Sequence, residues 1–245
     1  MNADRLADIF TLMERLDRHG SREPSLCHVA VELTGLDGAG VSLTPSPDVM
    51  TILCSHGPAA RLLLGAEMTL GEGPALHASR TGASVVESDL RHPSRPLWAP
   101  YASEALALGV RAAFAFPVRI GAIRFGALSL FRGTPGELSD DTTSDSQIMA
   151  SVVARAVLSM EAGAPPDDLL SELRGPFGLD FRVHQAAGML AVQASMPVRD
   201  ALVTLRAHSY ANGIELTTLA KNVIARRASI DQKTGAWIDT GAKPQ

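Results

Sequence analysis

The sequence has few cysteines, few aromatic residues and no long apolar run. Its 245 residues include two cysteines, Cys27 and Cys54, and 4% aromatic residues. Two cysteines are too few for the disulfide framework of a small secreted domain, and we expect both to be reduced, structural thiols. No window approaches 18 consecutive apolar residues, so no transmembrane helix is expected. These absences exclude a disulfide-rich scaffold and a membrane-spanning protein.

The first ten residues, MNADRLADIF, are amphipathic and contain acidic side chains. A secretory signal peptide has instead a basic tip and a long apolar run. We therefore expect a cytoplasmic protein.

Lysine is missing from residues 1–168, which carry 13 arginines against 20 acidic residues. The balance reverses in residues 169–229, where seven arginines and lysines face four acidic residues. Such an asymmetry predicts two modules with different partners. The positive surplus is small, so it also fits a solvated helix face that binds nothing.

Residues 1–161 have the apolar patterns of a mixed α/β domain. Helical spacing appears in residues 6–16 and 26–33, after Pro74, and in the segment that ends at Gly109. A longer helix is predicted from Ser139, which can cap it, to about residue 161. Short strands are predicted at 40–44, 49–55 and 84–88, followed by an antiparallel pair, 111–120 and 123–133, joined at Gly121–Ala122.

Beyond the linker AGAPPDD (162–168), the sequence predicts three short helices and no strand. Their apolar stripes are Val183, Ala186, Ala187, Leu190 and Ala194; Val198, Ala201, Leu202 and Leu205; and Leu216, Leu219, Ala220, Val223 and Ile224. We expect the remaining tail, 229–245, to be disordered, as chain termini tend to be.

Two blocks resemble known domain families. The block LGEGPALHASRTGASVVESDL, with ALALGVRAAFAFPVRIGAIRFGALSLF after it, resembles a GAF sensory domain over roughly residues 24–160. The block HQAAGML, with ALVTLRAHSYA and LAKNVIARR, resembles an ANTAR domain over roughly 169–228. Together they resemble the GAF–ANTAR regulators common in actinobacteria. The sequence departs from the ANTAR pattern at Ala187 and Glu215, where the family often has polar or basic residues.

The resemblance implies a fold class and a function. The fold would be an α/β GAF domain with a central antiparallel sheet, followed by a small all-α three-helix domain. The implied domains are an N-terminal helix (1–23), a GAF domain (24–161), a linker (162–168) and an ANTAR domain (169–228). ANTAR domains bind paired hairpins in nascent transcripts and act as transcription antiterminators, while GAF domains bind small ligands or mediate dimers. We therefore expect RNA as a partner, a homodimer, an unidentified small-molecule ligand, no membrane and no cofactor.

Positively charged, aromatic and small residues are the candidates for RNA binding. Guanidinium groups and rings stack on unpaired bases, cations contact phosphate, and small residues allow close approach of a backbone. Arg206 and Tyr210 are four residues apart and so share one helix face. The predicted RNA-binding residues are Arg182, His184, Gln185, Gly188, Arg206, Tyr210, Lys221, Arg226 and Arg227. Helix–helix packing is the alternative role for Gly188. For the positively charged residues, the alternative is a solvated basic face with Tyr210 half-buried in the core.

A glycine-rich turn and a histidine are further candidates for ligand binding. The turn LGEGP offers backbone N–H groups that can receive an anion, or it is a plain turn before a helix. His77 could face a pocket, although a single histidine is more often ordinary core or surface. No histidine, cysteine and acid cluster has metal-ligand spacing, and we expect no enzyme, although some GAF-like proteins reduce methionine sulfoxide with paired thiols. The alternatives to RNA binding are a DNA-binding regulator and a protein-interaction module.

Overall fold

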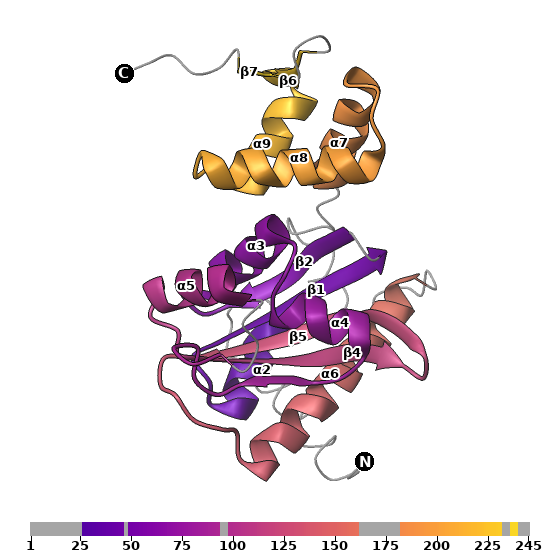
Figure 1. Cartoon of the computed structure of the whole chain (residues 1–245). Helices are drawn as coiled ribbons and strands as arrows, with labels where there is room; N and C mark the ends of the chain where they lie inside the picture. The colour runs from indigo at the N-terminus through magenta and orange to yellow at the C-terminus, as the bar shows by residue number, and fades with distance from the viewer. Residues whose placement is uncertain (1–25, 47–48, 94–97, 162–181, 232–235, 240–245) are drawn as a thin grey trace, which may run out of the picture. The chain divides into compact units, whose positions relative to one another are not determined.

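The computed structural model describes residues 26–46, 49–93, 98–161, 182–231 and 236–239. The chain forms two compact units, and the main run of the second extends from Asp180 to Gln245 (Figure 1). The predicted N-terminal helix (1–23), the predicted linker (162–168) and the first residues of the ANTAR-like block lie outside the described residues.

A five-stranded antiparallel sheet forms the centre of the first unit, in the order β2-β1-β5-β4-β3. The prediction of a central antiparallel sheet is therefore confirmed. Buried runs in β4 and β5 explain their central positions, since both faces of these strands are covered by helices. The strands are β1 (Gly38–Ser46), β2 (Val49–His56), β3 (Val85–Glu87), β4 (Ala112–Ile120) and β5 (Ile123–Arg132).

Helices cover the two faces of this sheet. One face carries α2 (Leu26–Thr34) and α6 (Asp140–Glu161), which enclose the main hydrophobic core with side chains such as Val41, Phe116 and Leu128. The other face carries α3 (Ala60–Leu70), α4 (Pro74–Thr81) and α5 (Ala99–Ala107). The hydroxyl of Ser139 accepts a hydrogen bond of 3.1 Å from the backbone N–H of Thr142, which confirms it as the cap of α6.

The second unit contains three helices, α7 (Arg182–Gln193), α8 (Val198–Ala211) and α9 (Leu216–Ile224). Most of the predicted apolar stripes are buried between them, including Val183, Leu190, Leu205 and Val223. Val198 is an exception, because 55% of its surface is exposed. It is the first residue of α8, so the stripe extends one turn beyond the packed core.

A two-stranded antiparallel hairpin, β6 (Ala228–Ile230) and β7 (Trp237–Asp239), follows α9. The prediction of a disordered tail over 229–245 is therefore wrong where the structure describes it, and the second unit is not all-α. Ala228 and Ile230 point into the unit and are buried, while the Trp237 ring stacks on His208 of α8 at 4.1 Å between centroids. Burial and stacking fix this segment.

The two cysteines form a disulfide, with their Cα atoms 6.0 Å apart. The prediction of reduced thiols is therefore wrong for this structure. Cys27 lies in the first turn of α2, and Cys54 lies on β2 opposite Val41 of β1. The helix packs over the sheet at this edge and brings the two sulfur atoms together.

No helix in the described parts of the chain combines the length and the apolar character needed to cross a membrane.

Candidate functional site

The outward face of α7 carries uncharged and apolar side chains. Gln185, Gly188, Met189 and Val192 follow one another at steps of three, one and three, opposite the buried stripe of the helix. Val192 is 80% exposed, and no atom lies within 4 Å of the position that a Cβ on Gly188 would occupy. Packing within the second unit does not require apolar side chains on the outward face of a surface helix. The face is therefore a candidate binding surface.

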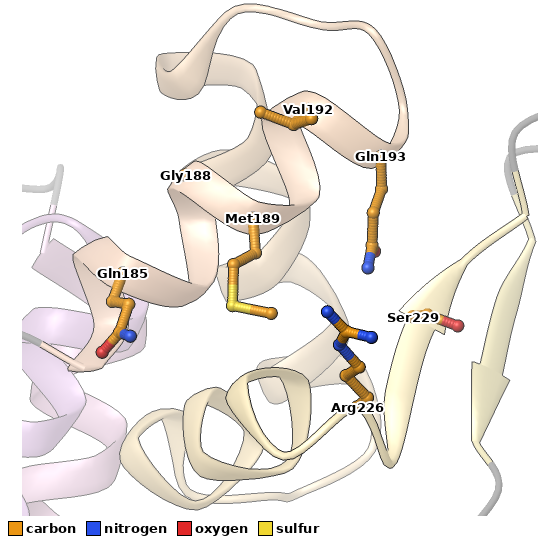
Figure 2. Close-up of a pocket in the computed structure, with 7 residues that line it drawn as sticks. All are labelled: Gln185, Gly188, Met189, Val192, Gln193, Arg226 and Ser229. Carbon is orange, nitrogen blue, oxygen red and sulfur yellow. The ribbon is translucent and has the colours of Figure 1, made fainter.

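This face forms one wall of a groove of about 660 Å³. Figure 2 shows the Arg226 side chain rising from the end of α9 toward Met189 and Gln193. The α7–β6 groove is lined by Gln185, Gly188, Met189, Val192, Gln193, Arg226 and Ser229. The structure thus brings together three of the predicted RNA-binding residues, Gln185, Gly188 and Arg226.

Arg226 occupies a backbone position that usually belongs to glycine. Its φ is 57°, in the left-handed region that favours glycine. The N–H of Arg226 donates to the carbonyl of Val223, and the N–H of Arg227 donates to the carbonyl of Asn222, at 2.9 and 2.8 Å. This is a Schellman motif in which an arginine replaces the customary glycine. A non-glycine residue in a strained conformation at a groove points to a functional role for its side chain.

The chemistry of the α7–β6 groove suits a nucleotide. Met189 and Val192 provide an apolar surface for the face of a base, while the amides of Gln185 and Gln193 can both donate and accept hydrogen bonds. The guanidinium of Arg226 offers several donors to a phosphate or to a base edge. A protein side chain of mixed polarity would use the same groups.

His184 and Arg206 form a second neighbourhood, on α7 and α8. Burial lowers the pKa of His184, and the nearby positive charge of Arg206 lowers it further. The imidazole is therefore neutral near pH 7 and contributes no charge to a phosphate site. Neither residue lines the α7–β6 groove.

Tyr210 lies on the exposed side of α8 and is 59% exposed. The spacing of Arg199, Val203, Arg206 and Tyr210, at steps of four, three and four, places them along one side of the helix. We call these four residues the α8 stripe. This exposure fits both the predicted RNA contact and the alternative of a solvated basic face with Tyr210 half-buried.

The remaining predicted cations, Arg182, Lys221 and Arg227, are exposed on the second unit. None of them lines the α7–β6 groove. Of the predicted cations, the groove thus contains Arg226 and not these three. Sequence reasoning missed Met189, Val192, Gln193 and Ser229. The first two could have been found, because they follow Gln185 at helical spacing on the side of α7 opposite its apolar stripe.

In the first unit, the turn LGEGP and the start of α4 receive a carboxyl group that belongs to the chain itself. Both carboxyl oxygens of Glu67 accept hydrogen bonds from α4, from the backbone N–H groups of Ala75 (3.3 Å) and Leu76 (3.0 Å). Burial raises the pKa of Glu67 to about 8, although these two hydrogen bonds act in the opposite direction. A Cβ on Gly73 would lie 2.4 Å from Cγ of Glu67, so this position requires glycine.

More polar groups are buried in the first unit. The hydroxyl groups of Tyr101, Ser42 and Ser129 are nearly inaccessible and have no hydrogen-bond partner within the part of the chain that the structure describes. The hydroxyls of Thr44 and Ser79 form a hydrogen bond with each other, and the rings of His77 and Trp98 meet edge to face at 5.5 Å. An unsatisfied buried hydroxyl costs free energy. The hydroxyl groups of Tyr101, Ser42 and Ser129 therefore mark places where a polar ligand or water would be stabilised. His77 is partly exposed and packs against an aromatic ring, as ordinary core histidines do.

Across the described parts of both units, no group of three or more histidine, cysteine or acidic side chains is arranged to hold a metal ion.

Comparison with known proteins gives structural neighbours but no family. No protein-family model matches the chain, and no curated protein matches it. The GAF-B domain of DevS from Mycobacterium smegmatis is similar, with 18% identity, 64% of this chain and 99% of that chain covered, and a TM-score of 0.40. The GAF domain of a phosphoenolpyruvate-protein phosphotransferase from Acinetobacter shows 13% identity, 69% and 100% coverage and a TM-score of 0.44. The GAF domain of the cyanobacteriochrome TePixJ shows 17% identity, 56% and 87% coverage and a TM-score of 0.44.

Proposed function

We propose that this protein is an RNA-binding antitermination regulator, in which a GAF sensor controls an ANTAR domain that binds paired hairpins in nascent transcripts. The observation that carries the proposal is the α7–β6 groove, into which Arg226 projects from a strained backbone position. The ANTAR-like sequence of residues 169–228 supplies the expectation of RNA. The groove supplies the chemical groups that an unpaired base and its phosphate need.

In this proposal, an unpaired nucleotide of a hairpin loop enters the α7–β6 groove. Its base lies on Met189 and Val192, its polar edge meets the glutamine amides, and its phosphate meets Arg226. Gly188 lets the sugar–phosphate backbone approach α7, since a larger side chain would project into that space. Two copies of the chain would bind two hairpins, as the resemblance implies.

The first unit would act as the sensor of a small molecule. Its unpartnered hydroxyl groups on Tyr101, Ser42 and Ser129 favour a polar ligand that satisfies them. A ligand that binds one state of the sensor more tightly than another would shift the availability of the RNA-binding unit.

Substitution of Gly188 tests the groove. A leucine at this partly exposed helical position meets no atom beyond its own stretch of helix within 4 Å of its Cβ, and leucine has a better helix propensity than glycine. We expect Gly188→Leu to keep or raise the melting temperature. It should weaken binding to a tandem-hairpin RNA by about fivefold or more, since a lost base contact costs about 1–3 kcal/mol. Ala207→Leu adds similar bulk to an exposed position of α8 and serves as the control.

The same titration separates the alternative functions. Unchanged RNA affinity in Gly188→Leu would remove the groove from the RNA-binding surface. Preference for duplex DNA over hairpin RNA in the wild-type chain would favour a DNA-binding regulator. Binding to neither nucleic acid, with an absorbance spectrum free of co-purified RNA, would favour a protein-interaction module.

A further inference from the structure

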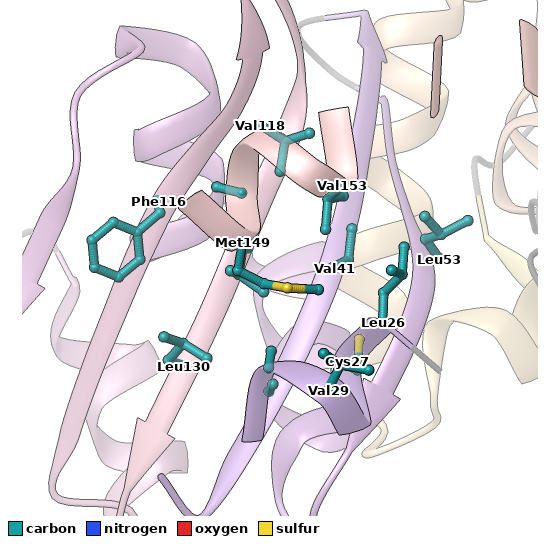
Figure 3. Packing of buried hydrophobic residues seen from close by; sticks show 14 of the residues in the cluster. Leu26, Cys27, Val29, Val41, Leu53, Phe116, Val118, Leu130, Met149 and Val153 are labelled. Carbon is teal, nitrogen blue, oxygen red and sulfur yellow. The ribbon is translucent and has the colours of Figure 1, made fainter. Parts of the chain in front are cut away.

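The Cys27–Cys54 disulfide joins two residues with different exposure. Cys27 is completely buried, whereas Cys54 is partly exposed on β2, which is an edge strand of the sheet. Figure 3 shows Cys27 within the packed side chains of the core, close to Val29 of the same helix. Cys54 is therefore the end of the disulfide that a nucleophile from solution approaches.

Cys27 is the leaving group when a thiolate attacks the sulfur of Cys54. Cys27 lies in the first turn of α2 and is buried in the hydrophobic core. An apolar environment disfavours a thiolate, so the sulfur released from the bond takes a proton. Attack at Cys54 thus leaves Cys27 as a buried thiol.

Other contacts hold α2 against the sheet independently of the disulfide. The rings of His28 and His56 stack at 4.4 Å between centroids, with planes 13° apart, and join the same two elements. Within α2, an oxygen of Glu32 lies 3.8 Å from Nε2 of His28, the helix partner in this stack. The hydrophobic core that contains Leu26 and Val29 also remains when the sulfur–sulfur bond opens. The reduced form therefore keeps the two cysteines near each other, so that the bond can form again.

We propose that Cys27 and Cys54 form a reversible redox site that is opened by low-molecular-weight thiols attacking Cys54. The external thiolate bonds to the sulfur of Cys54, the Cys27–Cys54 bond breaks, and Cys27 takes the electron pair and then a proton. A second external thiol attacks the external sulfur of the mixed disulfide and releases Cys54 as a thiol. One protein disulfide is reduced to two thiols, and two external thiols are oxidised to one disulfide.

Trapping with glutathione tests this proposal on the full chain. The oxidised protein is treated with reduced glutathione, quenched with acid, alkylated and analysed by intact mass and peptide mapping. We expect the trapped adduct on Cys54, complete reduction without loss of the circular dichroism signal, and a fall in melting temperature of about 5–10 °C. An adduct on Cys27, reduction only in urea, or free thiols in protein purified under air would overturn the proposal.

Single substitutions provide a second, independent measurement. In the native state, glutathione disulfide should modify Cys27→Ser, which retains Cys54, at least tenfold faster than Cys54→Ser, which retains buried Cys27. The two variants should react at equal rates in urea, because burial is then removed. Equal native rates would contradict the proposal, and if a variant fails to fold, the peptide map of the wild-type adduct decides the matter alone.

Discussion

The carboxylate of Glu67 accepts a hydrogen bond of 3.0 Å from the backbone N–H of Leu76, at the start of the following helix. The same carboxyl group is fully buried, and the hydroxyl of Tyr101, which this carboxylate influences electrostatically, is buried too. A helix start that would otherwise attract an external anion is thus occupied from within. The arrangement depends on pH, because burial favours the protonated acid.

The raised pKa of Glu67 predicts that the free energy of unfolding falls as the pH rises from 4.5 to about 8. Its pKa rises from 4.5 to about 8 on folding, so the folded state holds a proton that the unfolded state has released between these values. The stability contribution is fully present below pH 4.5 and is lost as the pH rises through 8. The free energy of unfolding should fall by up to about 1.4 kcal/mol per pH unit in this window.

Urea unfolding between pH 5.5 and 9 measures this slope. Glu67→Gln cannot ionise and should flatten the profile, while it keeps one acceptor for the N–H groups of α4. Glu104→Gln, at an exposed position of α5, is the matched control. A slope that survives in Glu67→Gln would assign the pH dependence to other groups.

Arg226 predicts opposite effects on stability and on RNA binding. Arg226→Gly relieves the left-handed backbone conformation and should stabilise the second unit by about 1 kcal/mol. It also removes a phosphate contact, so affinity for hairpin RNA should fall, and the slope of log affinity against log salt should decrease by about 0.7–0.9. Arg226→Lys retains the charge and should retain most of the slope. Equal salt slopes in Arg226→Gly and the wild type would exclude a phosphate contact.

The α8 stripe predicts a second contribution to RNA binding. Arg206→Ala and Tyr210→Ala should each weaken hairpin binding by about 1–3 kcal/mol if they stack on bases. Arg199→Ala removes a charge from the same stripe outside the predicted set and controls for general electrostatics. These residues lie outside the α7–β6 groove. Combining each α8 substitution with Gly188→Leu and measuring RNA affinity by fluorescence anisotropy would show whether the losses of binding free energy at the two surfaces add. Identical affinities for all three α8 variants and the wild type would restrict RNA binding to the groove.

The stack of Trp237 on His208 predicts that the terminal hairpin stabilises the second unit. Trp237→Ala should lower the free energy of unfolding by about 1 kcal/mol and speed amide exchange in β6. Ile238→Ser alters the neighbouring, exposed residue of the same strand and should change neither quantity. Exchange in β6 that is unaffected by Trp237→Ala would mean that Ala228 and Ile230 alone hold the hairpin.

Periodicity predicted most of the regular structure. The five strands and the helices α2, α4, α5 and α6 follow from apolar spacing and from turns at glycine and proline, because these patterns depend on neighbours in the chain. Val198 shows the limit of this reasoning, since a stripe indicates direction but not where the packing partner ends. The hairpin of β6 and β7 was missed for a related reason. Strands of three residues are too short to show a period, and contacts between residues that are distant in the sequence hold them in place.

Long-range features were beyond the reach of sequence patterns. The cysteines are 27 residues apart, and nothing in their spacing shows that a helix and an edge strand bring them together. Glu67 follows Leu63 and Leu64 on the buried stripe of α3. A polar residue on an apolar stripe, just before a glycine-rich turn, indicates a side chain that accepts hydrogen bonds from that turn or the next helix. The groove combines one face of α7 with the end of α9, so that Gln185 and Arg226 were predicted separately but not as neighbours.

The two tryptophans of the chain are divided between the two units, with Trp98 buried in the first and Trp237 stacked on an imidazole in the second. Each unit therefore carries one tryptophan. Trp98→Phe would leave a tryptophan emission signal that reports on the second unit alone, and Trp237→Phe would leave one that reports on the first unit. Ligand effects on one half can then be followed optically in the intact chain without an attached dye.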